Sequence, residues 1–369
     1  MKSKKQYLLF NILLILFSLF ASLIFVEGLF RILVPNFKAT SDEINHYCKY
    51  DPLLGWKNKP GATGRFIKKD FNTFIRINKK GLRDKQRNYK KQGPRIIALG
   101  DSFIWGYGVE QNERVTDILE DKLDGVEVVN MGCSGYGNDQ EMLLLLTQGL
   151  KYNPDMIIFN IHFISDIISN ADSMAYGYYK PLFIIDEDNL AIKNVILPKN
   201  GVGDILNFWL SDHLASWNCI KHRIYNKLPV QYYFAKYLNK LTGTGNQNTY
   251  RSNGDPEKIM LSIMLKIKDI ADKAGAKLLF VLIPYIKEGA IKVSQDSQLD
   301  SFMALIKQYD IKTLELEQAF TEFFKNNPGK TLTFKNDIHW NQSGHRVAAG
   351  AIYKFMLKNK DLIDSQPFP

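Results

Sequence analysis

The pattern of hydrophobic and polar positions changes at Arg95 in this chain of 369 residues. From there on, short continuous apolar runs alternate with segments of helical period, which is typical of a parallel sheet covered by helices on both faces. We therefore predict an α/β domain with a sheet of about five strands. The strands are expected at Arg95–Leu99, Val126–Asn130, Met156–Ile161, Lys277–Ile283 and Thr313–Leu316. The helices are expected at about Arg114–Leu123, Asp139–Leu150, Glu257–Ala274, Leu299–Tyr309 and Gly344–Leu357.

Polar residues and a glycine mark the ends of two of these helices. Asn138 stands just before the second helix and Asp255-Pro256 just before the third, so Asn138 and Asp255 are predicted N-caps. Gly275 follows the third helix and is predicted to end it.

A long apolar run precedes the β-α pattern. From about Tyr7 to Phe30 nearly every residue is Leu, Ile, Phe, Val, Ala or Ser, and a helix of this length can cross the hydrocarbon core of a bilayer. Lysines at positions 2, 4 and 5 precede the run. Because positively charged flanks stay inside, we predict a cytoplasmic N-terminus and an extracytoplasmic location for everything after Arg31.

A cleaved signal peptide is the alternative interpretation of this run. It is disfavoured because the run is long and ends in Phe25-Val26-Glu27-Gly28 without a clear small-x-small cleavage site. The sequence therefore predicts a single-pass membrane protein, with residues 1–34 forming the cytoplasmic N-terminus and the transmembrane anchor.

Two further segments depart from the β-α alternation. Residues 35–93 are rich in Lys, Asn, Gly and aromatic residues, and are predicted to form loops and short strands that pack on the domain of residues 94–362. Residues from about 170 to 254 interrupt that domain and include a predicted hairpin at Pro181–Asn194. This insertion follows the third strand at its C-terminal end, where open α/β sheets bind ligands. We interpret it as a lid or substrate-selecting insertion, with a structural elaboration as the alternative.

The net charge and the cysteines limit what this protein is expected to bind. The formal net charge of +10 suits an anionic partner such as an acidic glycan or a lipid surface, although the lysines are scattered along the chain. The sequence contains no zinc-knuckle spacing and no nucleic-acid-binding module, so nucleic-acid binding is not supported. The three cysteines, Cys48, Cys133 and Cys219, lie far apart and have neither a disulfide framework nor metal-ligand spacing.

The sequence offers candidates for acyl transfer through a serine, which needs a nucleophile, an imidazole base and a group that orients the base. Ser102 follows the first predicted strand and precedes the loop Gly106-Tyr107-Gly108, so it lies where that strand leaves the sheet. His339 lies just before the last predicted helix. Asp337 stands two residues earlier and can hold the ring nitrogen of His339 that faces away from the serine.

Three neighbouring polar residues are expected to play other roles. His345 falls within the last predicted helix and is expected to pack there. Asp101 lies at a turn, where an aspartate usually bonds nearby backbone amides. Asn336 carries no charge that can stabilise an imidazolium, so Asp337 is the predicted acid.

Three short blocks follow one another along roughly the last three quarters of the chain. They are Gly100-Asp101-Ser102-Phe103, Val129-Asn130-Met131-Gly132-Cys133-Ser134-Gly135-Tyr136-Gly137 and Asp337-Ile338-His339-Trp340-Asn341. Together they resemble the GDSL or SGNH hydrolase family, and more closely its membrane-associated branch of polysaccharide O-acetyl esterases and transferases. The resemblance implies a flavodoxin-like three-layer α/β/α sandwich, no cofactor, and hydrolysis or transfer of an acyl ester. It also implies that a glycine amide of the second block, at Gly135, donates to the oxyanion.

A fourth block departs from the family pattern. After the third strand the family expects an Asn-Asp pair whose asparagine donates to the oxyanion, and here that place reads Phe163-Ile164-Ser165-Asp166. The oxyanion would then lie between the backbone amides of Ser102 and Gly135 and the hydroxyl of Ser165. Losing one such donor typically costs on the order of a hundredfold to a thousandfold in turnover.

The sequence therefore predicts a membrane-anchored serine esterase or acyltransferase. Its expected substrate is an acyl ester, above all an O-acetyl ester, of a carbohydrate or lipid. The alternative is a catalytically weak or inactive glycan-binding or assembly protein with the same fold, and Ser165 is the residue that favours this alternative.

Overall fold

The computed structural model describes ten stretches of the chain. They are residues 4–33, 43–176, 178–187, 189–193, 210, 214, 216–217, 255–287, 290–291 and 297–362. The chain divides into two compact units, Met1–Ser41 with Asn200–Gln247 and Asp42–Lys199 with Asn248–Pro369. The second unit contains every strand of the described residues.

The first unit contains α1, a helix from Lys4 to Leu33. Its 30 residues span about 45 Å at the usual rise of a helix, more than the roughly 30 Å of a hydrocarbon core. Its most apolar window has a mean hydropathy of 2.7, so α1 is long and apolar enough to cross a membrane. A signal sequence near an N-terminus has the same properties, and α1 contains the predicted run from Tyr7 to Phe30.

The second unit is built on a five-stranded parallel sheet with the strand order β15-β12-β7-β5-β6. This arrangement confirms all five predicted strands. Counted along the chain the order is 2-1-3-4-5, the flavodoxin-like order, in which ligands bind where the order reverses beside the first strand. The strands are β5 (Arg95–Leu99), β6 (Glu127–Asn130), β7 (Met156–Ile161), β12 (Lys277–Leu282) and β15 (Thr313–Glu315).

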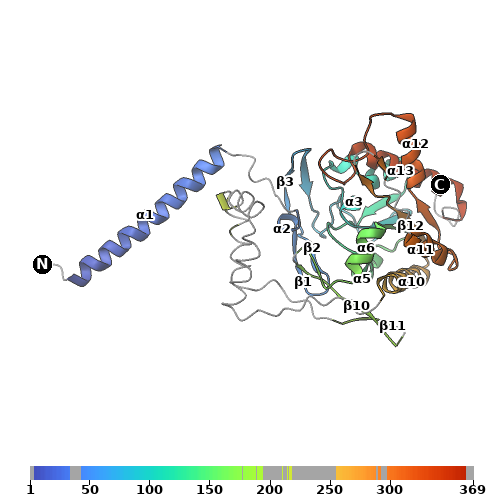
Figure 1. Cartoon of the computed structure of the whole chain (residues 1–369), viewed down its shortest axis with the longest axis horizontal. Coiled ribbons are helices and arrows are strands. Elements are labelled where there is room, and N and C mark those ends of the chain that lie inside the picture. The colour runs from blue at the N-terminus through green and yellow to red at the C-terminus, as the bar shows by residue number, and fades with distance from the viewer. Residues whose placement is uncertain are drawn as a thin grey trace. The chain divides into compact units, whose positions relative to one another are not determined.

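Helices cover both faces of this sheet (Figure 1). In β5, Ile96 and Ala98 pack in one apolar cluster while Ile97 and Leu99 pack in the other, as the period of two in a strand requires. The first cluster is completed by α4 (Val115–Lys122), α12 (Glu317–Asn326) and α13 (Gln342–Lys358). The second is completed by α5 (Asn138–Thr147), α10 (Pro256–Ala274) and α11 (Ser297–Lys307). The unit is thus a three-layer α/β/α sandwich.

The predicted helices are confirmed with boundaries shifted by a few residues. Asp255 caps α10 by accepting the Glu257 N–H, and Gly275 ends it with a φ of 66°. The prediction for Asn138 as an N-cap is wrong. The helix α5 starts at Asn138 with Gly137 as its N-cap, because the Asn138 side chain is buried instead of facing the helix end.

Two of the longer helices in the described residues were not predicted. They are α12 and α6 (Phe163–Asn170). Only Phe320 of α12 is buried, so its apolar stripe is narrow. The described residues also form shorter helices that were not predicted: α2 (Glu43–Tyr47), α3 (Ser102–Trp105), η2 (Gln111–Glu113), η3 (Gly149–Tyr152) and η5 (Lys360–Leu362).

Small antiparallel hairpins flank the sheet. In the stretch before β5 they are β1 (Cys48–Asp51) with β2 (Gly55–Asn58), and β3 (Thr63–Ile67) with β4 (Asn72–Arg76). After β7 they are β8 (Met174–Ala175) with β9 (Tyr178–Tyr179), β10 (Phe183–Asp186) with β11 (Asn189–Ile192), and β13 (Ile286–Lys287) with β14 (Ala290–Ile291). The β10–β11 pair confirms the hairpin predicted from the sequence.

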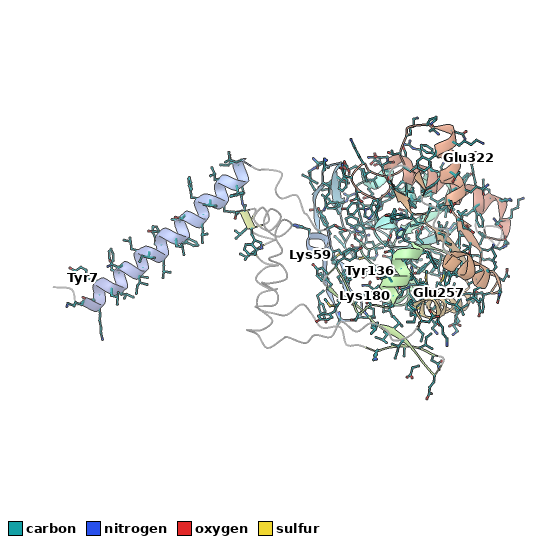
Figure 2. All side chains as sticks on the ribbon, in the orientation of Figure 1. Tyr7, Lys59, Tyr136, Lys180, Glu257 and Glu322 are labelled. Atoms are coloured by element: carbon teal, nitrogen blue, oxygen red, sulfur yellow. The ribbon has the colours of Figure 1, made fainter. Side chains whose placement is uncertain are left out.

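The beginning of the predicted insertion is attached to the sandwich by Lys180 (Figure 2). This side chain is fully buried and forms an ion pair of 2.5 Å with Asp139 at the start of α5. It also donates to the carbonyl of Ser169 in α6. Beyond residue 193 nearly all of the insertion, and Cys219 with it, lies outside the described residues. Cys48 and Cys133 are both buried, and Cys133 is a free thiol.

Candidate active site

Ser102 lies at the turn that leaves β5. It is the first residue of α3, and Asp101 caps this short helix by accepting the Phe103 N–H at 2.9 Å, which confirms the structural role expected for Asp101. A Cβ at Gly100 would lie 2.5 Å from Ile104, so the tight turn needs a glycine there. The turn therefore presents the Ser102 hydroxyl at the carboxyl end of the sheet, beside the point where the strand order reverses.

His339 and Asp337 lie in a closed loop between α12 and α13. The Phe334 N–H donates to the His339 carbonyl at 3.1 Å, and Thr333 and Trp340 form an antiparallel bridge. Within the loop, the Asp337 carboxylate accepts the His339 N–H at 3.0 Å and contacts the Nδ1 atom of its ring at 2.5 Å. Because Asp337 takes the Nδ1–H, the Nε2 atom of a neutral ring is left as an acceptor.

The structure brings these three predicted residues together. The Ser102 Oγ lies 2.7 Å from His339 Nε2, although 237 residues separate them along the chain. This distance lies within hydrogen-bond reach, so the hydroxyl can donate its proton to the ring. The chain of contacts runs from Ser102 through His339 to Asp337, which is the arrangement that activates a serine nucleophile.

The lowered pKa of the Asp337 carboxyl suits a group that orients the His339 ring. Partial burial raises its pKa, but hydrogen bonds from His339 and from the Tyr107 hydroxyl outweigh burial and hold the pKa below its ordinary value. The carboxylate is therefore charged at neutral pH, and a charged carboxylate can stabilise the imidazolium that forms when Ser102 gives up its proton.

Tyr107 is a site residue that the sequence did not single out. Its ring is stacked on the His339 ring, with centroids 3.9 Å apart and an interplanar angle of 19°. Gly106 and Gly108 on either side have φ angles of 86° and 80°, so the loop turns sharply around Tyr107. A bulky aromatic residue between two glycines just after the nucleophile is the signal that could have identified it.

His345 belongs to the core, as predicted. It is 1% exposed, and its Nδ1 accepts the Val115 N–H at 3.2 Å. Burial lowers the pKa of His345 to about 3, assisted by the charges of Arg83 and Arg114, so the ring is neutral. Its role is to accept the N–H at the start of α4.

The second glycine block crosses the end of β5. The Cys133 N–H donates to the Gly100 carbonyl at 3.1 Å, and the Tyr136 N–H closes a turn onto Cys133 at 3.3 Å. Gly135 occupies the third position of this turn with a φ of 80°, which fits a type II turn and requires glycine. Among the described residues, no acceptor binds the backbone N–H of Gly135 or that of Ser102. Both groups remain available to a ligand.

Ser165 lies in the first turn of α6 and has an exposed side chain with no hydrogen bond to another described residue. Asp166, the next residue, is buried, and its carboxylate accepts the N–H of His162 at 2.8 Å and the side-chain amide of Asn138 at 3.1 Å. Burial raises the pKa of Asp166 well above its ordinary value, with the negative charge of Asp101 adding to the effect. This block is therefore organised around a buried carboxyl group, while Ser165 faces outward.

A cavity of about 160 Å³ has none of Ser102, His339 and Asp337 in its lining. It is bounded by the β1–β2 hairpin, the segment around Gly81 and the side chains of Cys133 and Tyr136. Four lysines and no carboxylate line it: Lys49, Lys57, Lys79 and Lys80. Across the described parts of the chain, no group of three or more His, Cys, Asp or Glu side chains is arranged to hold a metal ion.

Comparison with known proteins gives structural likenesses only. No family model matches this sequence, and no curated protein matches it either. The fold is similar to a member of the lipolytic protein G-D-S-L family from Veillonella parvula, with 13% identity and a TM-score of 0.37 over 74% of this chain and 99% of that one.

Two solved esterases are similar to a comparable degree. The esterase EstA from Pseudoalteromonas sp. has 15% identity and a TM-score of 0.39 over 72% of this chain and 98% of its own. The acetyl xylan esterase AlAXEase has 17% identity and a TM-score of 0.38 over 70% of this chain and 98% of its own. At such low identities and TM-scores, a function must be inferred from the atoms of the site itself.

Proposed function

We propose that this protein is a serine hydrolase or acyltransferase that acts on acyl esters through Ser102, His339 and Asp337. The observation that supports the proposal is the continuous chain of contacts at 2.7 Å and 2.5 Å that joins the three side chains. A serine at a strand end is often only a helix cap, but here Asp101 already caps α3, which leaves the Ser102 hydroxyl free to point at the imidazole.

In the first step, the Ser102 Oγ attacks the ester carbonyl carbon while its proton moves to His339 Nε2. The C=O electron pair moves to oxygen and forms a tetrahedral oxyanion. When this collapses, the bond to the alcohol oxygen breaks and His339 gives its proton to the leaving alcohol. The acyl group is then bound to Ser102 as an ester, and Asp337 has held the imidazole ring in place throughout.

The oxyanion would be held by the backbone N–H groups of Ser102 and Gly135, both unused within the described structure. The Ser165 hydroxyl is the proposed third donor, and its exposed position makes it weaker than the asparagine amide expected in this family. Preorganised N–H donors are effective because they need no rearrangement as charge develops on the oxygen. Because one well-placed donor is typically worth on the order of a hundredfold to a thousandfold in turnover, a weak third donor would slow the reaction.

In the second step, water or a hydroxyl group of an acceptor attacks the acyl-serine. His339 Nε2 takes the proton of the attacking O–H, and the Ser102 oxygen recovers a proton from His339 as the acyl group leaves. Attack by water gives a carboxylic acid, whereas attack by an acceptor gives a new ester. The same residues serve both outcomes, and exclusion of water decides between them.

We further propose an O-acetylated carbohydrate, or a lipid ester, as the substrate, and α1 as an uncleaved membrane anchor with the sandwich outside the cytoplasm. The substrate class follows the resemblance of the sequence blocks to polysaccharide O-acetyl esterases and transferases. The anchor is supported by the length and hydropathy of α1 and by the lysines that precede its apolar run. Protease accessibility of the C-terminus in closed, right-side-out membrane vesicles tests the topology. A C-terminus that is protected in these vesicles lies in the cytoplasm and contradicts the proposal.

Covalent labelling tests the nucleophile. A fluorophosphonate probe should label the full-length protein, and the label should disappear in Ser102→Ala and in His339→Ala, because only the activated hydroxyl reacts. Ser262→Ala, which removes an unrelated hydroxyl on α10, is the matched control and should label like the wild type. A folded wild type that takes up no label would instead support the inactive glycan-binding or assembly protein. Release of acetate, compared with acetyl transfer to an oligosaccharide, separates esterase from transferase.

A further inference from the structure

The turn of the β3–β4 hairpin contacts the loop that carries Asp337 and His339. The Asn336 backbone N–H donates to one Asp70 oxygen at 2.7 Å, and the Asn336 side-chain amide donates to the other at 2.6 Å. Lys69 donates to the Asn336 side-chain oxygen at 3.3 Å. The ring of Phe71 lies 5.1 Å from that of Phe334 at the other end of this loop.

The same hairpin also holds the loop that follows the nucleophile. The buried Thr73 hydroxyl donates to the Gly108 carbonyl at 2.9 Å, and the Phe74 N–H donates to the Glu110 carboxylate at 3.0 Å. A Cβ at Gly108 would lie within 3 Å of both Phe71 and Phe334, so the three segments meet at this point. The hairpin therefore bridges two loops that lie more than 200 positions apart in the sequence.

Tyr107 lies at the centre of this junction. Its ring is 6% exposed and packs edge-on against Phe66 at 5.0 Å and against Phe71 at 5.4 Å, both from the hairpin. Its other contacts are with the candidate site: the ring is stacked on His339 and the hydroxyl donates to the Asp337 carboxylate. One side chain therefore contacts both the base and the acid.

We propose that Tyr107, held by the β3–β4 hairpin, is a positioning residue for the His339–Asp337 pair. The proposal rests on the function proposed above and extends it to a part of the chain outside the sandwich. The stacked ring limits rotation of the imidazole, and the hydroxyl fixes the carboxylate that holds Nδ1–H. Both effects keep Nε2 in line with the Ser102 hydroxyl, where a displacement of about 1 Å can cost on the order of a hundredfold in rate.

Two substitutions at Tyr107 separate its two contacts. Tyr107→Phe keeps the stacked ring and removes the hydroxyl, and should lower kcat about threefold to tenfold. Tyr107→Leu removes both, and should lower kcat roughly thirtyfold to a hundredfold. KM should stay unchanged in both, because Tyr107 is buried and its contacts are with other side chains. The assay is hydrolysis of 4-nitrophenyl acetate by the full-length protein in detergent, normalised to the folded fraction from thermal unfolding.

A pH profile distinguishes positioning from simple packing. Removing the Tyr107 hydroxyl takes away one of the hydrogen bonds that lower the pKa of Asp337. The Asp337 carboxyl then keeps its proton to a higher pH, so the low-pH limb of kcat should move upward in Tyr107→Phe. A residue that only fills space would leave that limb in place.

Asp70→Ala tests the hairpin without touching the triad. It removes both hydrogen bonds from Asn336 and should lower kcat about twofold to fivefold, with an unchanged melting temperature because these bonds are exposed. Combined with Tyr107→Phe it should show a non-additive loss, since both act on one loop. Tyr309→Leu, a change at a half-exposed tyrosine outside the site, is the matched control and should leave kcat unaltered.

The outcomes distinguish this proposal from the function on which it rests. If the wild type is labelled at Ser102 and hydrolyses the ester but folded Tyr107→Leu keeps at least half of its kcat, the positioning role is wrong and the function stands. An unmoved low-pH limb in Tyr107→Phe also counts against it. If the folded wild type neither labels nor turns over, both proposals fall.

Discussion

Asp337 and Asp166 are both carboxyl groups that accept a backbone N–H from a histidine of their own segment, yet their environments have opposite effects. Asp337 is partly exposed and bonded by the His339 ring and the Tyr107 hydroxyl, which lowers its pKa. Asp166 is buried close to other acids, which raises its pKa well above the ordinary value. Only Asp337 can therefore meet an imidazolium with a full negative charge.

The comparison also separates two halves of the candidate site. The half that carries the base and acid is joined by short contacts between two segments of the chain, residues 102–107 and 337–339. The half that should supply the third oxyanion donor is organised instead around Asn138, which bridges the buried carboxyl groups of Asp166 and Glu141. The groups that would transfer a proton are therefore held more firmly than the side chain that would stabilise the oxyanion.

The largest expected effect is the difference in kcat between the asparagine variants of Asp337 and Asp166. Asp337→Asn should lower kcat roughly a thousandfold to ten-thousandfold, because the charge and the correct ring tautomer are lost together. Asp166→Asn should lower kcat less than tenfold, since an amide oxygen can still accept the hydrogen bonds from His162 and Asn138. Steady-state hydrolysis of 4-nitrophenyl acetate by the two variants measures the difference. Equal losses would mean that the acid has been assigned to the wrong residue.

A smaller effect is expected at Ser165. Ser165→Asn supplies an amide with longer reach and should raise kcat up to about tenfold, because one oxyanion donor is worth on the order of a hundredfold when well placed. Ser165→Ala should lower kcat less than tenfold, since the hydroxyl is exposed. The measurement is kcat at saturating ester for both variants, with Ser262→Ala as control. A decrease in the asparagine variant would show that this position does not face the oxyanion.

The smallest effect concerns stability and pH. Burial raises the pKa of Glu141 well above its ordinary value, and Asp166 and Asp101 add to the effect. The folded protein therefore keeps this proton where the unfolded chain has released it, so the group costs stability as pH rises above about 4. Glu141→Gln removes that cost.

Glu141→Gln should raise the melting temperature by about 2–4 °C at pH 8 and by less at pH 5. Differential scanning calorimetry at the two pH values measures this change. Glu322→Gln, on the exposed face of α12, is the control and should show no dependence on pH. A glutamine variant that is less stable at pH 8 than the wild type would contradict the assignment of Glu141 as an unfavourable buried acid.

The sheet, and the segments that bring Ser102, His339 and Asp337 together, were predictable because their signals are local. Each strand is a continuous apolar run, and Ser102 and Asp337-Ile338-His339 lie beside predicted element ends. Contacts between distant side chains leave no such local signal. The stacking of Tyr107 on His339 joins residues 232 positions apart, and no periodicity reports it.

The error at Asn138 has the same physical origin. An asparagine before a helix usually caps it, but here its amide is drawn inward by two buried carboxyl groups that come from α5 itself and from α6. The preference of a residue for a local role was overridden by a tertiary contact. The exposed setting of Ser165 likewise depends on how α6 begins, and α6 was not predicted.

The buried pair of Lys180 and Asp139 has a consequence for engineering. Its two charges lie in the interior, so removing one partner leaves the other uncompensated, at a cost of about 3–5 kcal/mol. The chain is therefore fixed to α5 at Lys180. In a chimera, exchange should begin after Leu182, so that a new loop grafted there inherits this attachment and the recipient keeps its fold.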